Sequence, residues 1–336
     1  MKTTEGYFLG IDVGSVSTNL VVSDVDDNIV QRLYLRTGGQ PINVLLEGMR
    51  EIASGPGAQN IEAVGATGSG RELAGVIVGA DIVKNEITTH AVAAQKVIQG
   101  VQTILEIGGQ DSKIIILRNG VVHDFAMNTV CAAGTGSFLD RQASRLGVPI
   151  EEFGSLALKS TSPVRIAGRC AVFAESDMIH KQQTGHSTED IVNGLCEALV
   201  RNYLNNLAKG KDIREPIAFQ GGVAANEGIV KAFERALGKQ LIIPEYHAVM
   251  GAYGAALIAK QARMKTPGFK SRFYGFSSLN RDYKAKSMEC QGCSNSCEVI
   301  GIYSDGEVIA RWGDRCGKWG IMKGDTSSKE VQENRF

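Results

Sequence analysis

The 336-residue chain lacks an excess of charge of either sign, because 36 Lys and Arg residues balance 36 Asp and Glu residues. Proteins that bind nucleic acid or anionic membranes usually present a basic surface, so neither partner is expected. The chain also has no uncharged apolar run near the roughly 18 residues that a membrane-spanning helix needs, and its first residues contain no signal-peptide core. We therefore expect a soluble, cytoplasmic protein.

Proline is scarce as well, with 7 residues against 40 glycines, and 43% of the residues are hydrophobic. This composition excludes a disordered chain and favours an ordered α/β protein with many tight turns. The length favours two domains and a small appendage. Only 7 residues are cysteine, and in a cytoplasmic protein they indicate metal binding more than disulfides.

A strand, a polar glycine turn and a second strand are predicted twice, over residues 7–23 and again over residues 103–117. In this repeat Asp12 aligns with Glu106, and the glycines two residues later align as well. The repeat indicates an internal duplication. Two such loops that face each other would hold a polyphosphate between two domains, so the sequence predicts an interdomain cleft.

A third glycine turn follows a predicted strand near residue 220. In this order the three turns resemble the two phosphate loops and the adenosine loop of the superfamily that joins actin, heat-shock chaperone ATPases and sugar kinases. The resemblance implies an α/β fold of two ribonuclease-H-like halves that close over Mg-ATP. The residues expected to contact ATP are Gly14, Ser15, Val16, Ser17, Thr18, Gly108, Gly109, Gln110, Asp111, Gly221, Gly222, Val223 and Asn226.

Physical chemistry supports these assignments. Glycine lets backbone N–H groups approach phosphates, hydroxyls add donors, and carboxylates at strand ends hold Mg²⁺ through water. We expect Asp12 and Glu106 to form the Mg²⁺ shell. Gln110 either orients the attacking water or merely fills the loop, and both interpretations stay open.

Two cysteines, Cys131 and Cys170, each precede a predicted helix within glycine-rich sequence. A helix N-terminus favours a thiolate and bound anions. A cubane iron–sulfur cluster takes four thiolates, so two per chain predict a two-fold dimer with the cluster on its axis. The alternative is a pair of buried structural thiols.

The segments 128–139 and 168–177 closely resemble the ATP-dependent activators of 2-hydroxyacyl-CoA dehydratases and the ATPase subunits of benzoyl-CoA reductase, and the resemblance extends over residues 6–260. It implies a homodimer that bridges one [4Fe-4S] cluster through Cys131 and Cys170. It also implies that ATP hydrolysis drives one electron into a partner iron–sulfur enzyme, such as a dehydratase or a double-cubane-cluster reductase. Ferredoxin or flavodoxin is the expected electron donor.

The predicted organisation is a first half over residues 1–95, a second half over residues 96–264, a linker over residues 265–285 and a separate hairpin module over residues 286–336. Cys196 lies beside a helical apolar stripe in the second half, which predicts a core position.

The predicted module contains four cysteines around a hairpin, an arrangement that resembles a zinc ribbon or a small ferredoxin-like knot. Four thiolates complete one site for zinc or for a second cluster. A structural Zn²⁺ is slightly favoured, because it supplies folding energy that so small a module lacks. The predicted ligands are Cys290, Cys293, Cys297 and Cys316.

Two other functions remain open from the sequence. A small-molecule kinase of the same superfamily would phosphorylate a sugar or an acid in the cleft, although no sugar-reading loop is evident. A regulatory protein would bind ATP or metal without turnover and use the tail as its binding module.

Overall fold

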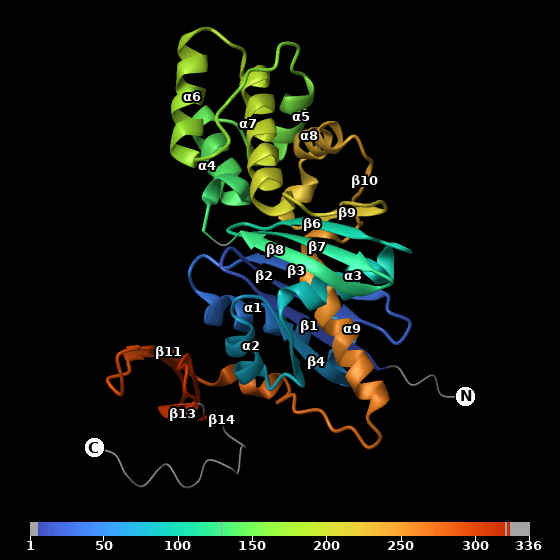
Figure 1. The fold of residues 1–336 in the computed structure, drawn as a ribbon. Coiled ribbons are helices and arrows are strands. Elements are labelled where there is room, and N and C mark those ends of the chain that lie inside the picture. The colour runs from blue at the N-terminus through green and yellow to red at the C-terminus, as the bar shows by residue number, and fades with distance from the viewer. Residues whose placement is uncertain (1–5, 129, 320, 323–336) are drawn as a thin grey trace.

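Two lobes, each with a five-stranded sheet, are stacked on one another (Figure 1). The computed structural model describes residues 6–128, 130–319 and 321–322. The first lobe contains β1 (Tyr7–Val13), β2 (Ser17–Ser23), β3 (Ile29–Arg36), α1 (Pro41–Ala53), β4 (Ile61–Thr67), α2 (Arg71–Val78), β5 (Ile82–Val83) and α3 (Glu86–Val97). The second contains β6 (Thr103–Ile107), β7 (Ser112–Arg118), β8 (Val121–Asn128), α4 (Gly136–Leu146), α5 (Ile150–Leu158), α6 (Ala171–Gln183), α7 (Thr188–Tyr203), β9 (Ile217–Gln220), α8 (Glu227–Leu237) and β10 (Leu241–Ile242).

The two sheets have the same topology. The strand orders are β3-β2-β1-β4-β5 and β8-β7-β6-β9-β10, in which the first two pairings are antiparallel and the last two parallel. The turn after the first strand is also repeated, since the Gly14 N–H donates to the Ser17 carbonyl (2.8 Å) and the Gly108 N–H to the Asp111 carbonyl (3.0 Å). The predicted duplication is therefore present at the level of strand order and of turn geometry.

The lobes are joined by α3 and by α9 (Met250–Lys265), which packs on β1, β2 and β4 of the first lobe. Glycines permit this packing: a Cβ atom on Gly10 would lie 1.8 Å from the Ala252 carbonyl oxygen, and one on Gly65 would lie 2.2 Å from that of Ala255. A buried cluster that includes Ile104, Leu257 and residues of α3 then connects both sheets. The cleft walls are therefore attached to a shared apolar core.

The second lobe differs from the first by its helical insertion between β8 and β9 (Figure 1). Its longest helix, α7, is capped by Ser187, whose hydroxyl accepts the Asp190 N–H. The predicted apolar stripe of α7 is buried, and Cys196 lies in that core as expected. After Tyr203 the chain continues as a π-helical segment, Leu204–Ala208.

The C-terminal region forms a third sheet of β11 (Tyr283–Glu289), β12 (Glu298–Ser304), β13 (Glu307–Trp312) and β14 (Ile321–Met322). Leu279 and Tyr283 are buried in the same core as residues of α1 and α2, and the Arg50 guanidinium donates to the Leu279 carbonyl at 3.2 Å. The sequence predicted a separate module behind a linker, whereas this region packs on the first lobe. The difference arises because a few apolar residues in this mostly polar stretch, such as Leu279 and Tyr283, are buried against the first lobe. Residues 323–336 of the predicted module lie outside the described residues.

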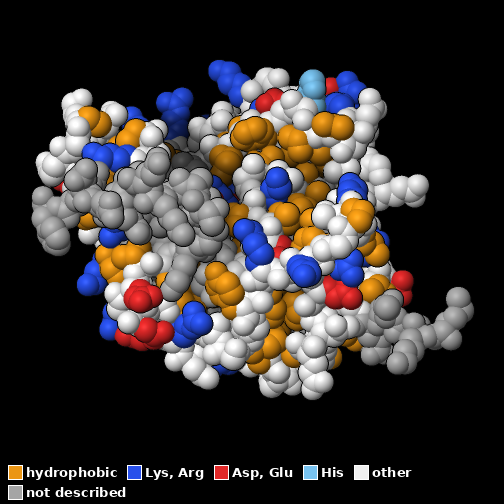
Figure 2. All heavy atoms as spheres, turned by 90° about the horizontal axis from the view of Figure 1, so that it is seen from below, with side chains coloured by type: hydrophobic (Ala, Val, Ile, Leu, Met, Phe, Trp, Pro, Cys, Tyr) orange, Lys and Arg blue, Asp and Glu red, His pale blue; other side chains and the backbone are white. Residues whose placement is uncertain are grey.

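Basic and acidic side chains are mixed on the surface (Figure 2), as the equal numbers of the two kinds in the sequence lead one to expect. On the face shown in Figure 2, basic side chains are scattered among hydrophobic and acidic ones and form no continuous basic surface. Within the described residues, no helix has the length and apolar character that crossing a membrane requires.

Candidate functional site

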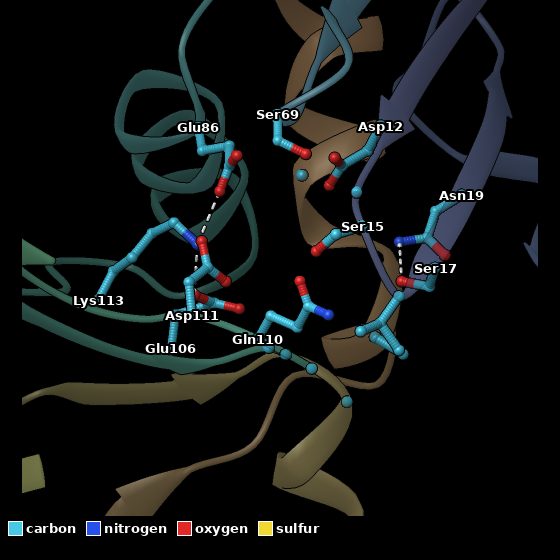
Figure 3. Close-up of a pocket in the computed structure, with 18 of the residues that line it drawn as sticks. Asp12, Ser15, Ser17, Asn19, Ser69, Glu86, Glu106, Gln110, Asp111 and Lys113 are labelled. Carbon is cyan, nitrogen blue, oxygen red and sulfur yellow. Dashed lines mark hydrogen bonds and ion pairs between the residues drawn. The ribbon is translucent and has the colours of Figure 1, made fainter. Parts of the chain in front are cut away.

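A cavity of about 340 Å³ lies between the lobes, and both glycine turns open onto it. Figure 3 shows Asp12 and Ser15 on one wall facing Lys113, Asp111 and Gln110 on the other. Twelve of the predicted site residues line it: Asp12, Gly14, Ser15, Val16, Ser17, Glu106, Gly108, Gly109, Gln110, Asp111, Gly221 and Gly222.

An adjoining cavity extends from the same loops toward α4, α5 and the start of α8. Val223 and Asn226 line this second cavity, together with Val16, Tyr34 and other residues. The side chain of Asn226 accepts the Ile229 N–H and so caps α8. The two cavities share five lining residues, namely Val16, Tyr34, Gly108, Gly109 and Gly222. The two adjoining cavities together fit an elongated ligand with a polyphosphate at one end.

Thr18 is the exception among the predicted nucleotide contacts. It is fully buried, and its hydroxyl bonds to that of Thr37 at 3.0 Å. Side chains alternate between the two faces of a strand. Because Ser17 faces the cavity, its neighbour Thr18 faces away from it.

Asp12 is the penultimate residue of β1, where the strand ends at the cavity. Burial raises its pKa to about 7, and the negative charge of Glu86 adds to the increase. Asn19 stands opposite Asp12 on β2. Among the described residues, Asn19 Oδ1 is buried without a hydrogen-bond partner. A buried carboxylate and a buried unsatisfied amide oxygen are both ligands that suit a hard cation.

Lys113 was not predicted as a site residue, although it belongs to the repeated segment. Its buried ammonium lies 2.6 Å from Glu86, 2.9 Å from Glu106 and 2.8 Å from Asp111. Burial lowers the pKa of Lys113, but the three carboxylates outweigh burial and raise it above its ordinary value. A lysine directly before the apolar run 114–117 of a predicted strand was the available signal for this role.

The carboxylates of this cluster respond differently to burial. Burial raises the pKa of Glu106 above its ordinary value despite the nearby ammonium. For Glu86, which was also not predicted, burial acts in the same direction, but the charge of Lys113 prevails and the pKa is lowered. His90 completes this wall: burial and the charge of Lys113 lower its pKa to about 3, which keeps the imidazole neutral.

The charge balance of the cavity bears on its ligand. Four carboxylates, those of Asp12, Glu86, Glu106 and Asp111, face one ammonium. A polyphosphate and those carboxylates that are ionised would repel one another unless a divalent cation accompanied the phosphates. The donor set of Asp12, Asn19 Oδ1 and the loop hydroxyls therefore fits Mg²⁺ bound together with the phosphates. In the described part of the chain, no three His, Cys, Asp or Glu side chains already form a metal-binding cluster.

Cys131 and Cys170, which are far apart in sequence, come together on one surface of the second lobe. Cys131 Sγ lies 3.9 Å from the carbonyl oxygen of Arg169, the residue before Cys170. Both cysteines are partly exposed, so they are not buried structural thiols. Large apolar residues lie next to the two cysteines in the sequence, and their side chains are exposed: Val130 by 95%, Val172 by 68% and Phe173 by 65%.

The local structure at the two cysteines differs. Cys170 is the N-cap residue of α6, as predicted. Cys131 precedes a short 3₁₀ turn, and α4 begins only at Gly136. The side chain of Asn128 accounts for this, because it accepts the Cys131 N–H at 2.9 Å and donates to the Cys131 carbonyl at 2.8 Å. The prediction of a helix directly after Cys131 is therefore wrong by about one turn.

The C-terminal cysteines stand around the β11–β12 hairpin. The Cys290 N–H donates to the Cys297 carbonyl at 2.8 Å, and Cys290 Sγ accepts the Trp319 Nε1–H at 3.2 Å and the Gly292 N–H at 3.4 Å. Cys293 and Cys316 are exposed. Over the described residues the four thiols are not gathered into one site, so a metal here stays a prediction.

Known proteins resemble this chain over most of its length. Residues 9–259 match the model of the BadF/BadG/BcrA/BcrD ATPase family. A 2-hydroxyisocaproyl-CoA dehydratase activator of Clostridioides difficile is 35% identical over 256 residues, which cover 75% of this chain and 94% of that protein. An (R)-2-hydroxyglutaryl-CoA dehydratase activating ATPase of Acidaminococcus fermentans is 34% identical over 266 residues, which cover 77% and 99%. An uncharacterized protein of Methanocaldococcus jannaschii is 31% identical, and the alignment covers 79% of this chain but only 65% of that longer protein.

Solved structures resemble the chain in the same region. The activator of the 2-hydroxyisocaproyl-CoA dehydratase from Clostridium difficile, with bound ADPNP, has a TM-score of 0.70 and 33% identity, and the match covers 77% of this chain and 96% of that one. An ethanolamine utilization protein of Carboxydothermus hydrogenoformans (TM-score 0.51, 19% identity, 76% and 91% covered) and a ROK family glucokinase of Streptomyces griseus (0.50, 14%, 76% and 100%) share the fold alone. Together with the duplicated sheets, these structures confirm the predicted fold class.

Proposed function

Because the chain belongs to the BadF/BadG/BcrA/BcrD ATPase family, we propose that it is an ATP-dependent activator that passes one electron to a partner iron–sulfur enzyme. The observation that carries the proposal is the combination of two sites in one chain. A two-walled cavity suits Mg-ATP, and a pair of partly exposed thiols lies on the surface of the same lobe that supplies the second phosphate loop.

ATP binding is supported by the relative that holds ADPNP. In this chain the loops around Gly14 and Gly109 would hold the phosphates, and the cavity beside Val223 and Asn226 would hold the nucleoside. Asp12 would hold Mg²⁺. Gln110 points into the opening in Figure 3, which supports the interpretation that it orients the attacking water.

The cysteine surface suits a cluster shared by two chains. Cys131 and Cys170 supply two of the four thiolates that a [4Fe-4S] cluster needs, and a second copy would supply the others. The cluster would carry the single electron, and the exposed side chains of Val130, Val172 and Phe173 would be covered in the dimer. Ferredoxin or flavodoxin would reduce it. A 2-hydroxyacyl-CoA dehydratase or a double-cubane-cluster reductase would accept the electron.

The C-terminal cysteines would bind one additional ion, zinc or a second cluster. The Trp319 Nε1–H and the Gly292 N–H donate to Cys290 Sγ. The bond from Trp319 contributes most to lowering the pKa of Cys290, which favours a thiolate ligand. Metal analysis of the wild-type protein and of a Cys290→Ser variant tests this assignment. Equal metal content in the two proteins would contradict it.

Nucleotide binding is tested with Gly222→Ala and Gly222→Val. A Cβ atom at this position would meet no protein atom closer than 3.4 Å, at the Tyr34 hydroxyl, so the protein should tolerate the change. A bound nucleoside should not, and ATP affinity should fall progressively from Gly to Ala to Val. Unchanged affinity in Gly222→Val would count against the site, and phosphoryl transfer to a sugar by the wild-type protein would favour the kinase alternative instead.

The cluster is tested with Cys131→Ala under anaerobic conditions, with Cys196→Ala as the matched control. Cys196 is buried in the core, and burial raises the pKa of its thiol to about 12. We expect about four iron atoms per dimer at the bridging site in the control. Cys131→Ala should lose this iron while it still binds ATP. Full retention of the bridging iron in Cys131→Ala would overturn the model.

A further inference from the structure

The C-terminal end of α7 contacts Lys113, which lines the nucleotide cavity, and the loops that carry Cys131 and Cys170. We infer that Asn202 and Tyr203, which no motif pointed to, are positioning residues that couple these two sites. The inference rests on the proposed function, because it assumes that nucleotide binds in the cavity, and it adds a physical route by which the nucleotide reaches the thiols.

Tyr203 makes the contact on the nucleotide side. Its hydroxyl is buried and donates to the backbone carbonyl of Lys113 at 2.5 Å. The ammonium of Lys113 is in the cavity and pairs with Glu86 from the first lobe as well as with Glu106 and Asp111 from the second. A phosphate or Mg²⁺ that changes these ion pairs would therefore act on the residue whose backbone Tyr203 holds.

Asn202 makes the contact on the thiol side. Its amide nitrogen donates to the Gly168 carbonyl at 2.6 Å and lies 3.8 Å from Cys131 Sγ. A Cβ atom on Gly134 would lie 2.7 Å from Asn202 Oδ1, so the side chain also touches the turn after Cys131. The side chain of Asn202 thus lies between the two loops that carry Cys131 and Cys170.

The helix is also irregular at this point. The π-helical segment Leu204–Ala208 begins directly after Tyr203 and contacts β7 and β8. Such segments are rare and are frequently found at functional sites. Asn202 and Tyr203 are adjacent and directly precede this irregular turn. A small displacement at Lys113 can therefore reorient Asn202 without unfolding the helix.

The test measures the alkylation of each cysteine by iodoacetamide in the full-length protein, with and without ADPNP, resolved by peptide mass spectrometry. In the wild-type protein we expect ADPNP to change the rate at Cys131 by about fivefold or more, the lower end of allosteric couplings. The exposed thiols of Cys293 and Cys316 are internal references whose rates should stay the same.

Two variants and one matched control separate coupling from stability. Tyr203→Phe removes only the hydroxyl and keeps the ring that packs edge-on against Phe233. Tyr253→Phe is the control, since that buried hydroxyl also donates to a backbone carbonyl, that of Asp27 at 2.8 Å, but lies on α9. Tyr203→Phe and Asn202→Leu should bind ADPNP as the wild-type protein does and lose the rate change at Cys131, whereas Tyr253→Phe should keep it.

The outcomes distinguish this inference from the proposed function. A wild-type protein that does not bind ADPNP overturns both. If the wild-type protein binds ADPNP without a rate change at Cys131, or if Tyr203→Phe keeps the full change, only the coupling is wrong. Loss of ADPNP binding in Tyr203→Phe also overturns it, because the hydroxyl would then serve the nucleotide site itself. If Asn202→Leu does not fold, Tyr203→Phe decides alone.

Discussion

The two lobes have one topology but place different side chains at equivalent positions. Where the central strands end at the cavity, the three paired residues are Asp12, Asn19 and Thr67 in the first lobe and Glu106, Lys113 and Gln220 in the second. The second lobe thus neutralises its carboxylate with its own lysine. Among the described residues no ion pair involves Asp12. The comparison shows that one duplicated scaffold supports two different walls: the carboxylate of the second lobe is paired with a lysine of the same sheet, whereas Asp12 in the first lobe faces the amide of Asn19.

The lobes also differ in how closely a helix can approach the sheet. Gly10 pairs with Gly65 in the first sheet, whereas the equivalent pair in the second is Ile104 with Ala218. The glycines admit the backbone of α9, which arrives from the second lobe. The first sheet is therefore covered by a helix that also joins the two lobes.

Replacing Lys113 should have the largest effect. In Lys113→Met three buried or partly buried carboxylates lose the cation that they share, and breaking a buried ion pair costs about 3–5 kcal/mol. Urea denaturation measures the change in the free energy of unfolding. Lys231→Met is the control, because its pair with Glu234 is exposed on the lysine side and should contribute less than about 1 kcal/mol. Equal stabilities of the two variants would show that the cluster does not stabilise the second wall.

Gly10→Ala should be next. The added methyl group would overlap the Ala252 carbonyl and push α9 away from β1, at a cost of about 3 kcal/mol, the upper end for overpacking. Thermal unfolding measures the loss. Gly222→Ala provides the comparison, since its Cβ atom meets only the Tyr34 hydroxyl and should leave the melting temperature nearly unchanged. A loss below about 1 kcal/mol in Gly10→Ala would mean that α9 does not need the glycines.

The sequence predicted the features that depend on local order. Strands that alternate with glycine turns revealed the duplication, and the hairpin at Asn119 and Gly120 has the positive φ angles, 52° and 73°, that its sequence favours. Asn85 caps α3 by accepting the Thr88 N–H, a role that asparagine favours at a helix start. Each of these features is decided by neighbouring residues.

The sequence did not predict features in which residues from distant parts of the chain come together. The partners of Lys113 come from α3, β6 and the turn before β7, and no spacing in the sequence brings these carboxylates together. The packing of Tyr283 on the first lobe likewise depends on surfaces distant in sequence. Thr18 was misplaced for a simpler reason, since a glycine-rich motif does not show which face of β2 points to the cavity.

Asn19→Ala should have a smaller effect on folding. Its Oδ1 is buried without a partner, so removing it should change the free energy of unfolding by about 1 kcal/mol or less. If Asn19 completes the cation site of the first wall, the affinity for Mg-ADPNP should fall by about tenfold, equivalent to 1.4 kcal/mol. The affinity for ADPNP in EDTA should be the same in variant and wild-type protein. A similar loss in EDTA would show that Asn19 contacts the nucleotide rather than the metal.

The last prediction concerns the pH dependence of the helical insertion, which the first lobe does not share. Asp190 accepts hydrogen bonds from the Ser160 hydroxyl and from the backbone N–H groups of Thr161 and Ser162, and the bond from Ser160 contributes most to lowering its pKa to about 2. Since the folded pKa lies below the unfolded value of about 4, the carboxylate stabilises the fold above that pH. This stabilisation is lost as the pH falls through about 2. Urea midpoints of wild-type and Asp190→Asn proteins should therefore differ by a constant amount above about pH 5 and converge between pH 4 and 2. A difference that does not change with pH would show that hydrogen bonding alone, without the charge, anchors residues 160–162 to α7.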